Sequence, residues 1–320
     1  MNVPEPRFRI SRHRRTAWLG SGLAAVLSVI GLLASWLNPG IHAPLKPGLD
    51  FTGGTQIQLE RSCAAGGCSA ISAPEIQKAL ASLTLPAEPG ESSPNLGNAS
   101  VQVLDQGQSL VLRVQDLNPG QASALVQEMQ AIAGPLNPQS ISVDTIGPTL
   151  GQQLLKGSVV SLVVSFIGIA AFITFRYDGV FAFLALFALG HDVLITCGAF
   201  AWLGLIAGVE VDSLFAVSLI TVAGYSVTDT VVVFDRIREQ RTTLADLSLS
   251  EQVDVAVDAT LTRSLYTSFT TLLPLLGLIF FGGASLFWFA VALTIGIAVG
   301  SWSSIGVAPT LLPVLAKSKG

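Results

Sequence analysis

An aspartate lies inside an apolar run of the sequence that is long enough to cross a membrane. The run extends from residue 211 to 234, and Asp229 lies well inside it. About 20 apolar residues suffice to span the roughly 30 Å hydrocarbon core of a bilayer. An ionised carboxylate near the bilayer centre costs at least about 2.5–3.5 kcal/mol on insertion scales, so such a residue usually faces the protein interior and marks an ion or proton path. Asp229 is therefore the first candidate for chemistry.

Polar side chains next to Asp229 recur at helical spacing. Thr221, Tyr225, Thr228 and Asp229 fall on one face of a helix, whereas most of the valines between them fall elsewhere. A polar stripe of this kind is unfavourable in contact with lipid. We expect it to face neighbouring helices.

Arg263 is a second charged residue inside an apolar run. It belongs to another polar stripe, whose other members are Thr260, Thr267, Thr270 and Thr271. Asp229 lies about five residues and Arg263 about three residues inside the inner ends of their runs, a difference of roughly 3 Å at 1.5 Å per residue. The sequence therefore predicts that the guanidinium reaches Asp229 and forms an intramembrane proton site with it. Two alternatives are a static ion pair and an arginine that extends to the interface and pairs with nothing.

His191 and Asp192 add two titratable groups in a further apolar run. We predict that Asp192 lines the same polar interior as Asp229, or that it fixes helix ends by accepting hydrogen bonds. His191 is more typical of a satisfied core residue than of a proton relay. Gly296 and Gly300 form a G-x-x-x-G pair, which indicates close helix packing. No phosphate-binding loop occurs in the sequence, so no nucleotide, cofactor or metal is expected, and energy must come from ions or a partner.

The composition predicts an integral membrane protein, because 50% of the residues are hydrophobic and 12% are charged. The six predicted spans are Ala17–Trp36, Gly157–Phe175, Val180–Ile206, Ser213–Phe234, Thr260–Phe281 and Leu286–Val314. The first could also be a signal peptide, but its length and the Asn-Pro-Gly that follows favour an uncleaved span. Arginines crowd the N-terminus, and Asp235 and Arg236 are predicted to mark the cytoplasmic water boundary of the fourth span. Both termini are therefore predicted to be cytoplasmic.

Residues 38–150 are predicted to form an external domain between the first span, in residues 1–37, and a five-helix domain, residues 151–320, with a cytoplasmic loop at 236–259. The predicted elements are strands at Asp50–Glu60, Ser100–Leu104, Leu110–Gln115 and Gln139–Ile146, helices at Ala73–Leu83 and Gly120–Ala133, and a loop at Pro86–Asn98. This β-α-β-β-α-β order predicts a ferredoxin-like arrangement. The expected fold class is an α-helical polytopic membrane protein with six transmembrane helices plus a small α+β ferredoxin-like external domain.

Cys63 and Cys68 lie five residues apart in the segment predicted to be external, where a disulfide could persist. A disulfide and two free thiols are equally compatible with the spacing. A metal site is not indicated, because no histidine or second cysteine pair lies nearby.

Several strings in the sequence resemble the SecD/SecF family of bacterial protein-export membrane proteins, within the resistance-nodulation-division superfamily. These strings are GLDFTGGTQIQL at 48–59, IGPTLGQQLL at 146–155, AGYSVTDTVVVFDRIRE at 223–239, TLTRSLYTSFTTLLPL at 260–275, and FGG with GSWSSIGVAPTLL at 281–312. The first contains Asp50, Gly53 and Gly54 of the external domain motif. The resemblance assigns Asp229 and Arg263 to the family's proton pathway. Here Arg263 lies between Thr262 and Ser264, so the hydroxyl positions are exchanged relative to the family's S-R-T segment.

The resemblance implies a non-enzymatic subunit in the bacterial inner (plasma) membrane that uses the proton motive force in late protein export. It implies a SecD partner that completes a twelve-helix heterodimer, and contacts with the SecYEG translocon, YajC, a YidC-type insertase and the unfolded protein in transit, but not with nucleic acid. One alternative is a structural assembly factor in which Asp229 and Arg263 only pack helices. Another is half of a small-molecule exporter of the same superfamily.

Overall fold

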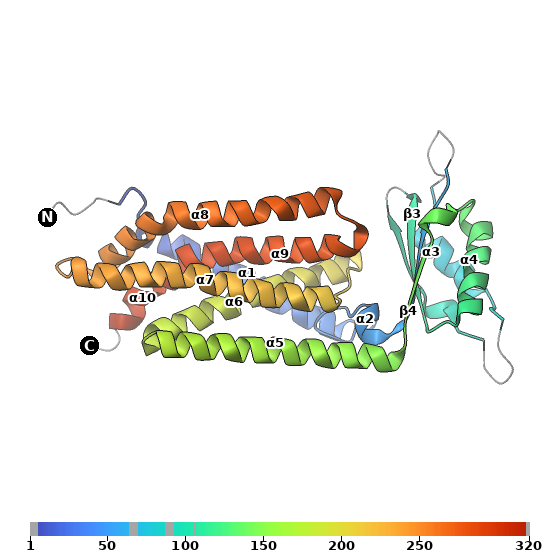
Figure 1. Cartoon of the computed structure of the whole chain (residues 1–320), viewed down its shortest axis with the longest axis horizontal. Coiled ribbons are helices and arrows are strands. Elements are labelled where there is room, and N and C mark those ends of the chain that lie inside the picture. The colour runs from blue at the N-terminus through green and yellow to red at the C-terminus, as the bar shows by residue number, and fades with distance from the viewer. Residues whose placement is uncertain (1–5, 64–69, 87–92, 105–106, 318–320) are drawn as a thin grey trace. The chain divides into compact units, whose positions relative to one another are not determined.

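The computed structural model describes residues 6–63, 70–86, 93–104 and 107–317. Its contacts divide the chain into two compact units (Figure 1). One unit is helical and comprises Met1–Lys46 and Ser158–Gly320, and the other comprises Pro47–Gly157.

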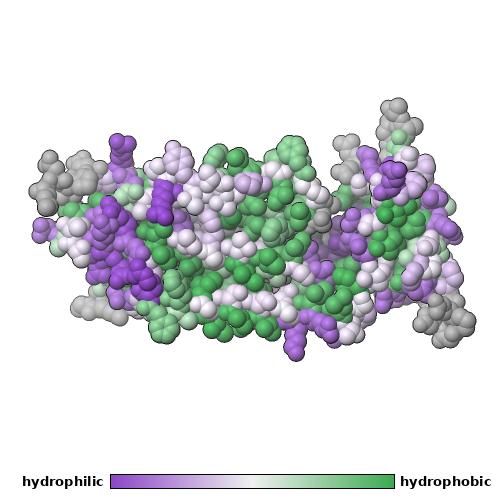
Figure 2. All heavy atoms as spheres, viewed as in Figure 1, coloured by the Kyte–Doolittle hydropathy of each residue, from purple (hydrophilic) through white to green (hydrophobic). Residues whose placement is uncertain are grey.

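Six helical segments of the described residues are long and apolar enough to cross a membrane, which confirms the predicted number of spans. They contain α1 (Arg14–Leu37), α5 (Pro148–Arg176), α6 (Gly179–Ala207), α7 (Ser213–Thr243), α8 (Leu249–Phe281), and α9 (Ala284–Trp302) with α10 (Ala308–Lys317). Apolar side chains cover the middle of the helical unit, and a hydrophilic group lies at the end where α7 passes into α8 (Figure 2). The predicted loop at 236–259 is wrong in extent, because α7 and α8 continue as helices and leave residues 244–248 between them.

Small residues let the spans approach one another closely. A Cβ atom on Gly198 of α6 would lie 2.1 Å from the Cβ of Ser28 on α1, and one on Gly296 of α9 would lie 2.2 Å from Cγ2 of Val222 on α7. A Cβ on Gly300 would lie 3.3 Å from the Cβ of Ser226. The interpretation of Gly296 and Gly300 as a close-packing pair is therefore confirmed.

The sixth span is not one regular helix. The π-helical turn η5 (Ser303–Val307) separates α9 from α10, and the backbone N–H of Ala308 donates to the carbonyl of Ser303. A π-helical turn carries one extra residue, which changes the direction of the side chains around it, and such turns are frequent at functional sites. The turn positions two adjacent serines, which are described below.

The smaller unit is built on a four-stranded antiparallel sheet with the strand order β2-β3-β1-β4. Its strands are β1 (Gly54–Glu60), β2 (Ser100–Leu104), β3 (Ser109–Val114) and β4 (Ser142–Ile146), and its longer helices are α3 (Ala73–Ala81) and α4 (Pro119–Ala133). These elements follow one another in the predicted β-α-β-β-α-β order. Both helices pack on one face of the sheet, where Ile57 and Leu112 meet Ile76 and Leu125 in one buried cluster.

The first strand is shorter than predicted, because the chain before it is helical. A short helix, α2 (Leu49–Thr52), contains Asp50, and it ends at Gly53, whose φ is +72°. Gly54 follows with a φ of +125°, and a Cβ atom there would lie 2.5 Å from the carbonyl oxygen of Val114. Both positions require glycine, and β1 begins at the second of them.

We expect Gly54→Ala to lower the stability of the smaller unit by at least about 2 kcal/mol, because it combines a φ that only glycine adopts readily with a collision against backbone. Thermal unfolding and limited proteolysis of the full chain would measure the effect. Gly147→Ala is a matched control, because a Cβ there meets no atom within 4 Å. Equal stability of the two variants would contradict the prediction.

Candidate functional site

Asp192 of α6 is completely buried and is held by hydroxyl groups from two other segments. Its Oδ2 accepts hydrogen bonds from Ser226 Oγ of α7 at 2.6 Å and from Ser303 Oγ of η5 at 2.8 Å. Its Oδ1 lies 2.9 Å from Nδ1 of the neighbouring His191. The prediction that Asp192 lies in a polar interior is therefore consistent with its surroundings, and its hydrogen bonds also tie three segments together.

Asp229 of α7 is also buried, with 7% of its surface exposed. Its Oδ1 accepts a hydrogen bond from Ser264 Oγ of α8 at 2.7 Å, and its Oδ2 accepts one from Ser304 Oγ of η5. Both donors are neutral hydroxyls. Asp229 therefore resembles Asp192 in its surroundings, and neighbouring serines of one turn contact the two carboxylates.

The arrangement suits reversible proton binding. A buried ionised carboxylate is costly unless it is paired with a cation or well supplied with hydrogen bonds. A serine hydroxyl can donate to an ionised carboxylate and can accept from a protonated one, so both states of Asp192 and Asp229 keep hydrogen-bond partners. Within the part of the chain that the structure describes, no group of three or more histidine, cysteine or acidic residues could hold a metal ion.

Two buried polar atoms beside the carboxylates lack a partner in the structure. They are Nε2 of His191 and the hydroxyl oxygen of Thr230. Buried polar groups are nearly always hydrogen-bonded, so these two atoms are exceptions among the described residues. His191 is therefore less completely satisfied than the sequence suggested.

The predicted pairing of Arg263 with Asp229 is not formed in this structure. Its side chain is exposed, and among the ion pairs of the described residues none includes it. The next residue, Ser264, takes the expected place, since one residue rotates the side chain by about 100° around a helix. Thr267 and Thr270 are exposed as well, and their hydroxyls bond carbonyls of their own helix. Arg263, Thr267 and Thr270 therefore face away from this chain's core, whereas Thr260 of the same stripe is buried.

The predicted stripe of α7 is divided between two faces. Thr221 and Thr228 are exposed and bond carbonyls one turn earlier on α7. The buried polar residues of α7 instead include Ser218, Ser226, Asp229 and Thr230. Ser218, Ser226 and Ser264 were not selected from the sequence, and their only signal was spacing relative to the aspartates.

Asp235 anchors a cluster between the C-terminal end of α5 and the C-terminal part of α7. It accepts hydrogen bonds from Arg176 at 3.0 Å and from the hydroxyl of Tyr177 at 3.1 Å. Burial, and then the negative charge of Asp235, raises the pKa of Tyr177 above its usual value. Arg236 pairs with Glu239 at 2.6 Å. This cluster is polar and partly exposed, as expected for residues near a water boundary.

Residues 7–11 are bound to the N-terminal part of α8 by two acidic side chains. Asp254 accepts hydrogen bonds from the backbone N–H of Ser11 at 2.8 Å and from its hydroxyl at 2.5 Å. Asp258, one turn later, accepts from the backbone N–H of Phe8 at 2.9 Å and of Arg7 at 3.2 Å. The sequence analysis did not predict this attachment.

The motif residues Asp50, Gly53 and Gly54 belong to the smaller unit, whereas the buried carboxylates belong to the helical unit. Asp50 is in the first turn of α2, and Gly53 and Gly54 shape the entry into β1. Cys63 is disulfide-bonded, whereas Cys68 lies outside the described residues, so their pairing stays a prediction.

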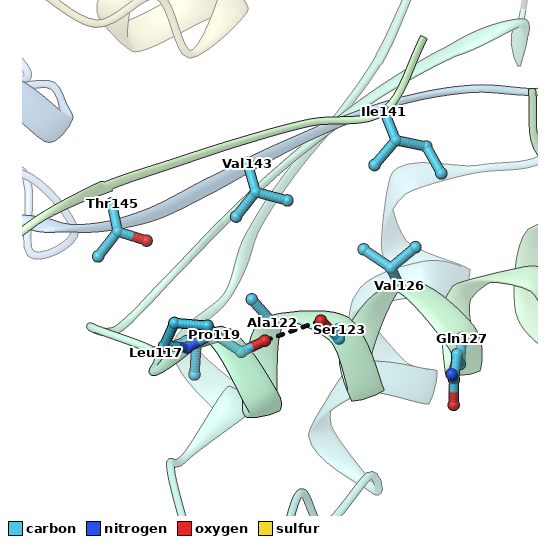
Figure 3. A pocket seen from close by; sticks show the side chains of 9 residues that line it. All are labelled: Leu117, Pro119, Ala122, Ser123, Val126, Gln127, Ile141, Val143 and Thr145. Carbon is cyan, nitrogen blue, oxygen red and sulfur yellow. Dashed lines mark hydrogen bonds between the residues drawn. The ribbon is translucent and has the colours of Figure 1, made fainter. Parts of the chain in front are cut away.

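A hollow of about 660 Å³ lies between α4 and the edge strand β4 of the smaller unit (Figure 3). Its lining is mostly apolar and includes Leu117, Val126, Ile141 and Val143. None of the residues selected from the sequence lines it. The hollow therefore offers no titratable group for chemistry.

These features are typical of a polytopic membrane protein of the transporter class. They are the six spans, the antiparallel sheet unit that follows the first span in the sequence, and the carboxylates buried among the helices. Residues 126–318 match the family model "Protein export membrane protein SecD/SecF, C-terminal", and residues 40–65 match the "SecD/SecF GG Motif". The chain belongs to the SecD/SecF family.

Two SecF subunits match this chain over nearly their whole length. The chain is 50% identical over 305 residues to the protein translocase subunit SecF of Prochlorococcus marinus, covering 95% of this chain and 94% of the relative. It is 44% identical over 307 residues to that of Synechocystis sp., covering 95% and 93%. These matches assign the chain to protein transport in the Sec pathway.

The crystal structure of SecDF from Thermus thermophilus, described as a translocon-associated membrane protein, is similar to the whole chain. The TM-score is 0.79 at 28% identity, and the match covers 100% of this chain and 40% of SecDF. In that organism the matching sequence is thus part of a longer SecDF chain, which implies that SecD is a partner of SecF proteins. The relatives are named as translocase subunits and not as enzymes.

Proposed function

We propose that this chain works with a SecD partner and uses the proton motive force to assist late steps of protein export. The observation that carries the proposal is the pair of buried carboxylates, Asp192 and Asp229, inside spans and held by neutral hydroxyls. The serine hydroxyls can hydrogen-bond both the ionised and the protonated state of each carboxylate.

Arg263 is proposed to set the proton affinity of Asp229 in a conformation that brings the two together. Its exposed guanidinium and the exposed side chains of Tyr266 and Thr267 lie on a helix of membrane length. Charged and polar groups facing lipid are unfavourable, so this face of α8 needs a protein cover. We propose that SecD supplies the cover and that the two chains form a twelve-helix heterodimer.

The orientation follows from charge and from chain direction. Arginines precede α1, and in Figure 1 the start of α1 and α10 lie at the same end of the helical unit as the connection between α7 and α8. From the positive-inside rule we propose that both termini are cytoplasmic, and from the family that the chain lies in the bacterial inner membrane. The smaller unit is then external, and we propose that its sheet order and two helices make it a ferredoxin-like domain that meets the emerging protein. SecYEG, YajC and a YidC-type insertase are the proposed neighbours.

The available energy is sufficient for a two-state movement. A charge that crosses the membrane gains about 2.3 kcal/mol per 100 mV. Inverting a population from 1:99 to 99:1 needs about 5.5 kcal/mol, which two protons supply at roughly 120 mV. Two carboxylates that each carry one proton could therefore supply the energy for this change between two states.

A structural assembly role is a second candidate, because the hydrogen bonds of Asp192 alone connect α6, α7 and η5. In that case the carboxylates would fasten helices and would not titrate. The proton-coupled role and the assembly role differ in one expectation. Replacing a charged residue in a span by a neutral one should reduce proton-driven transport only in the first.

Arg263→Met separates the two functions. The complex with SecD is reconstituted in vesicles with SecYEG, and export of a stalled late intermediate is driven by an imposed proton gradient without ATP. We expect at least about a tenfold loss in Arg263→Met and a smaller loss in Arg263→Lys, which retains the charge but not the planar donor geometry. Export at the wild-type rate in Arg263→Met, with the complex intact, would support the assembly role.

A further inference from the structure

The adjacent serines of the π-helical turn connect the two buried carboxylates. Ser303 donates to Asp192 of α6, and Ser304 donates to Asp229 of α7. We propose that these two serines sense the protonation of the two carboxylates and convert it into a change in the backbone of η5. This inference rests on the proton role proposed above for Asp192 and Asp229.

Each of the two hydroxyls has a second acceptor within reach. Ser303 Oγ lies 3.1 Å from the carbonyl oxygen of Gly300, and Ser304 Oγ lies 3.1 Å from that of Ser301. A hydroxyl has one hydrogen, so at any moment it donates to the carboxylate or to the carbonyl. Ser226 and Ser264 differ from them, since the described contacts of their hydroxyls are with the carboxylates alone.

Protonation decides which acceptor is used. An ionised carboxylate has no hydrogen to offer and attracts the serine hydrogen strongly, because hydrogen bonds to charged groups are stronger than neutral ones. When the carboxylate takes up a proton, its new O–H donates to the serine oxygen, and the serine hydrogen turns to the carbonyl three residues earlier. The proton remains on the carboxyl group throughout, and a rotation of the hydroxyl suffices for the exchange.

The carbonyls involved belong to the last turn before η5. That of Gly300 already accepts the backbone N–H of Ser303, so a hydroxyl donor competes for the same oxygen. Back-bonding of serine to a carbonyl of the preceding turn weakens the helix ladder and bends it. The π-helical turn, closed by the bond from Ala308 N–H to the Ser303 carbonyl, lies directly after this point and can absorb the bend.

Few other charges act on this region. His191 contacts Asp192 from α6, and Tyr225 of α7 bonds Ser268 and not a carboxylate. Arg263 of α8 is exposed. Residues 284–307, which contain α9 and η5, include no titratable residue, and α1 has Arg14 and Arg15 only at its start. The serines therefore respond to the two carboxylates and to His191 through Asp192.

Solid-state NMR of the reconstituted complex with SecD can observe the turn directly. Two Ser-Ser dipeptides occur in the sequence, Ser92-Ser93 and Ser303-Ser304, so serine labelled with ¹³C at the carbonyl and with ¹⁵N gives two cross peaks. Ser92→Ala identifies the first peak. The second reports the Ser303 carbonyl that closes η5. We expect this peak to move with pH in the wild type and to lose that movement in the double variant Asp192→Asn, Asp229→Asn.

Function is tested in the same vesicles. Ser304→Ala is expected to reduce proton flux about tenfold, in line with loss of a hydrogen bond to a charged group, and Ser304→Thr, which keeps the hydroxyl, is expected to restore most of it. Ser301→Ala is the matched control, because the Ser301 hydroxyl contacts Ser268 and the carbonyl of Ile297 and no carboxylate.

The outcomes separate this inference from the proposed function. A peak that does not move with pH, combined with a loss of flux in Asp229→Asn, overturns the sensing role and leaves the proton role in place. Wild-type flux in Asp229→Asn overturns the proton role and the inference with it. Equal flux in Ser304→Ala and Ser301→Ala also overturns the inference.

Discussion

Replacement of Asp229 by Asn is expected to reduce proton flux and proton-driven export to the level of vesicles that lack the chain. Asparagine has the same shape and stays neutral at all working pH values, so the site is fixed in a state that resembles the protonated one. Its amide oxygen can accept from Ser264 or Ser304, while its NH₂ group turns one of the two hydroxyls into an acceptor. The fold should therefore survive while the exchange of protons stops.

Asp235→Asn is the matched control for this variant. Asp235 lies on the same helix and is also hydrogen-bonded, but its side chain is 42% exposed and its partners are Arg176 and Tyr177. We expect near wild-type proton flux from it. Flux that is retained in Asp229→Asn, with the complex intact by copurification, would contradict the proton role of Asp229.

Gly296→Leu is expected to prevent stable folding of the helical unit. Even one carbon atom at this position would lie 2.2 Å from Val222 of α7, and Val222 is completely buried. Adding single methylenes to a packed core typically costs about 1–3 kcal/mol, and a leucine side chain adds several carbon atoms at a point where the α9 backbone packs against the buried Val222 side chain. α7 and α9 must separate to accept it.

The thiol of Cys197 provides the measurement. This cysteine is free and lies in α6, next to Gly198. After accessible thiols are blocked, heating in detergent with a fluorogenic maleimide reports unfolding, and the Gly296→Leu curve should show no cooperative transition or one at much lower temperature. Gly168→Leu on α5 is the control, since a Cβ there meets no atom within 4 Å. Coincident curves for both variants would refute the close-packing argument.

Features that depend on neighbouring residues along the chain could be predicted from the sequence. The six spans follow from hydropathy, and the start of α3 follows from Ser72 and Glu75, which form the expected capping box. Hydropathy also identified Asp192 and Asp229 as polar groups in apolar surroundings, and both are buried.

The partners of these carboxylates could not be predicted, because they depend on the rotation of each helix. One residue corresponds to about 100°, which is the difference between Arg263 facing outward and Ser264 facing Asp229. Hydroxyl residues occur on several faces of α7 and α8, so their spacing alone cannot select the buried face. The π-helical turn could not be predicted either, since the string Ser303-Ser304-Ile305-Gly306-Val307 contains no proline that would mark a break.

The attachment of the first residues to α8 has a mechanical consequence. Asp254 precedes Ser264 by ten residues, about 15 Å along one continuous helix. A helix resists stretching, so an axial displacement of the segment that touches Asp229 is passed to Asp254 and, through Ser11, to the tether that leads into α1. Residues 7–11 therefore transmit force between α1 and α8, and a fusion partner that pulls on them would load the helix that contacts Asp229.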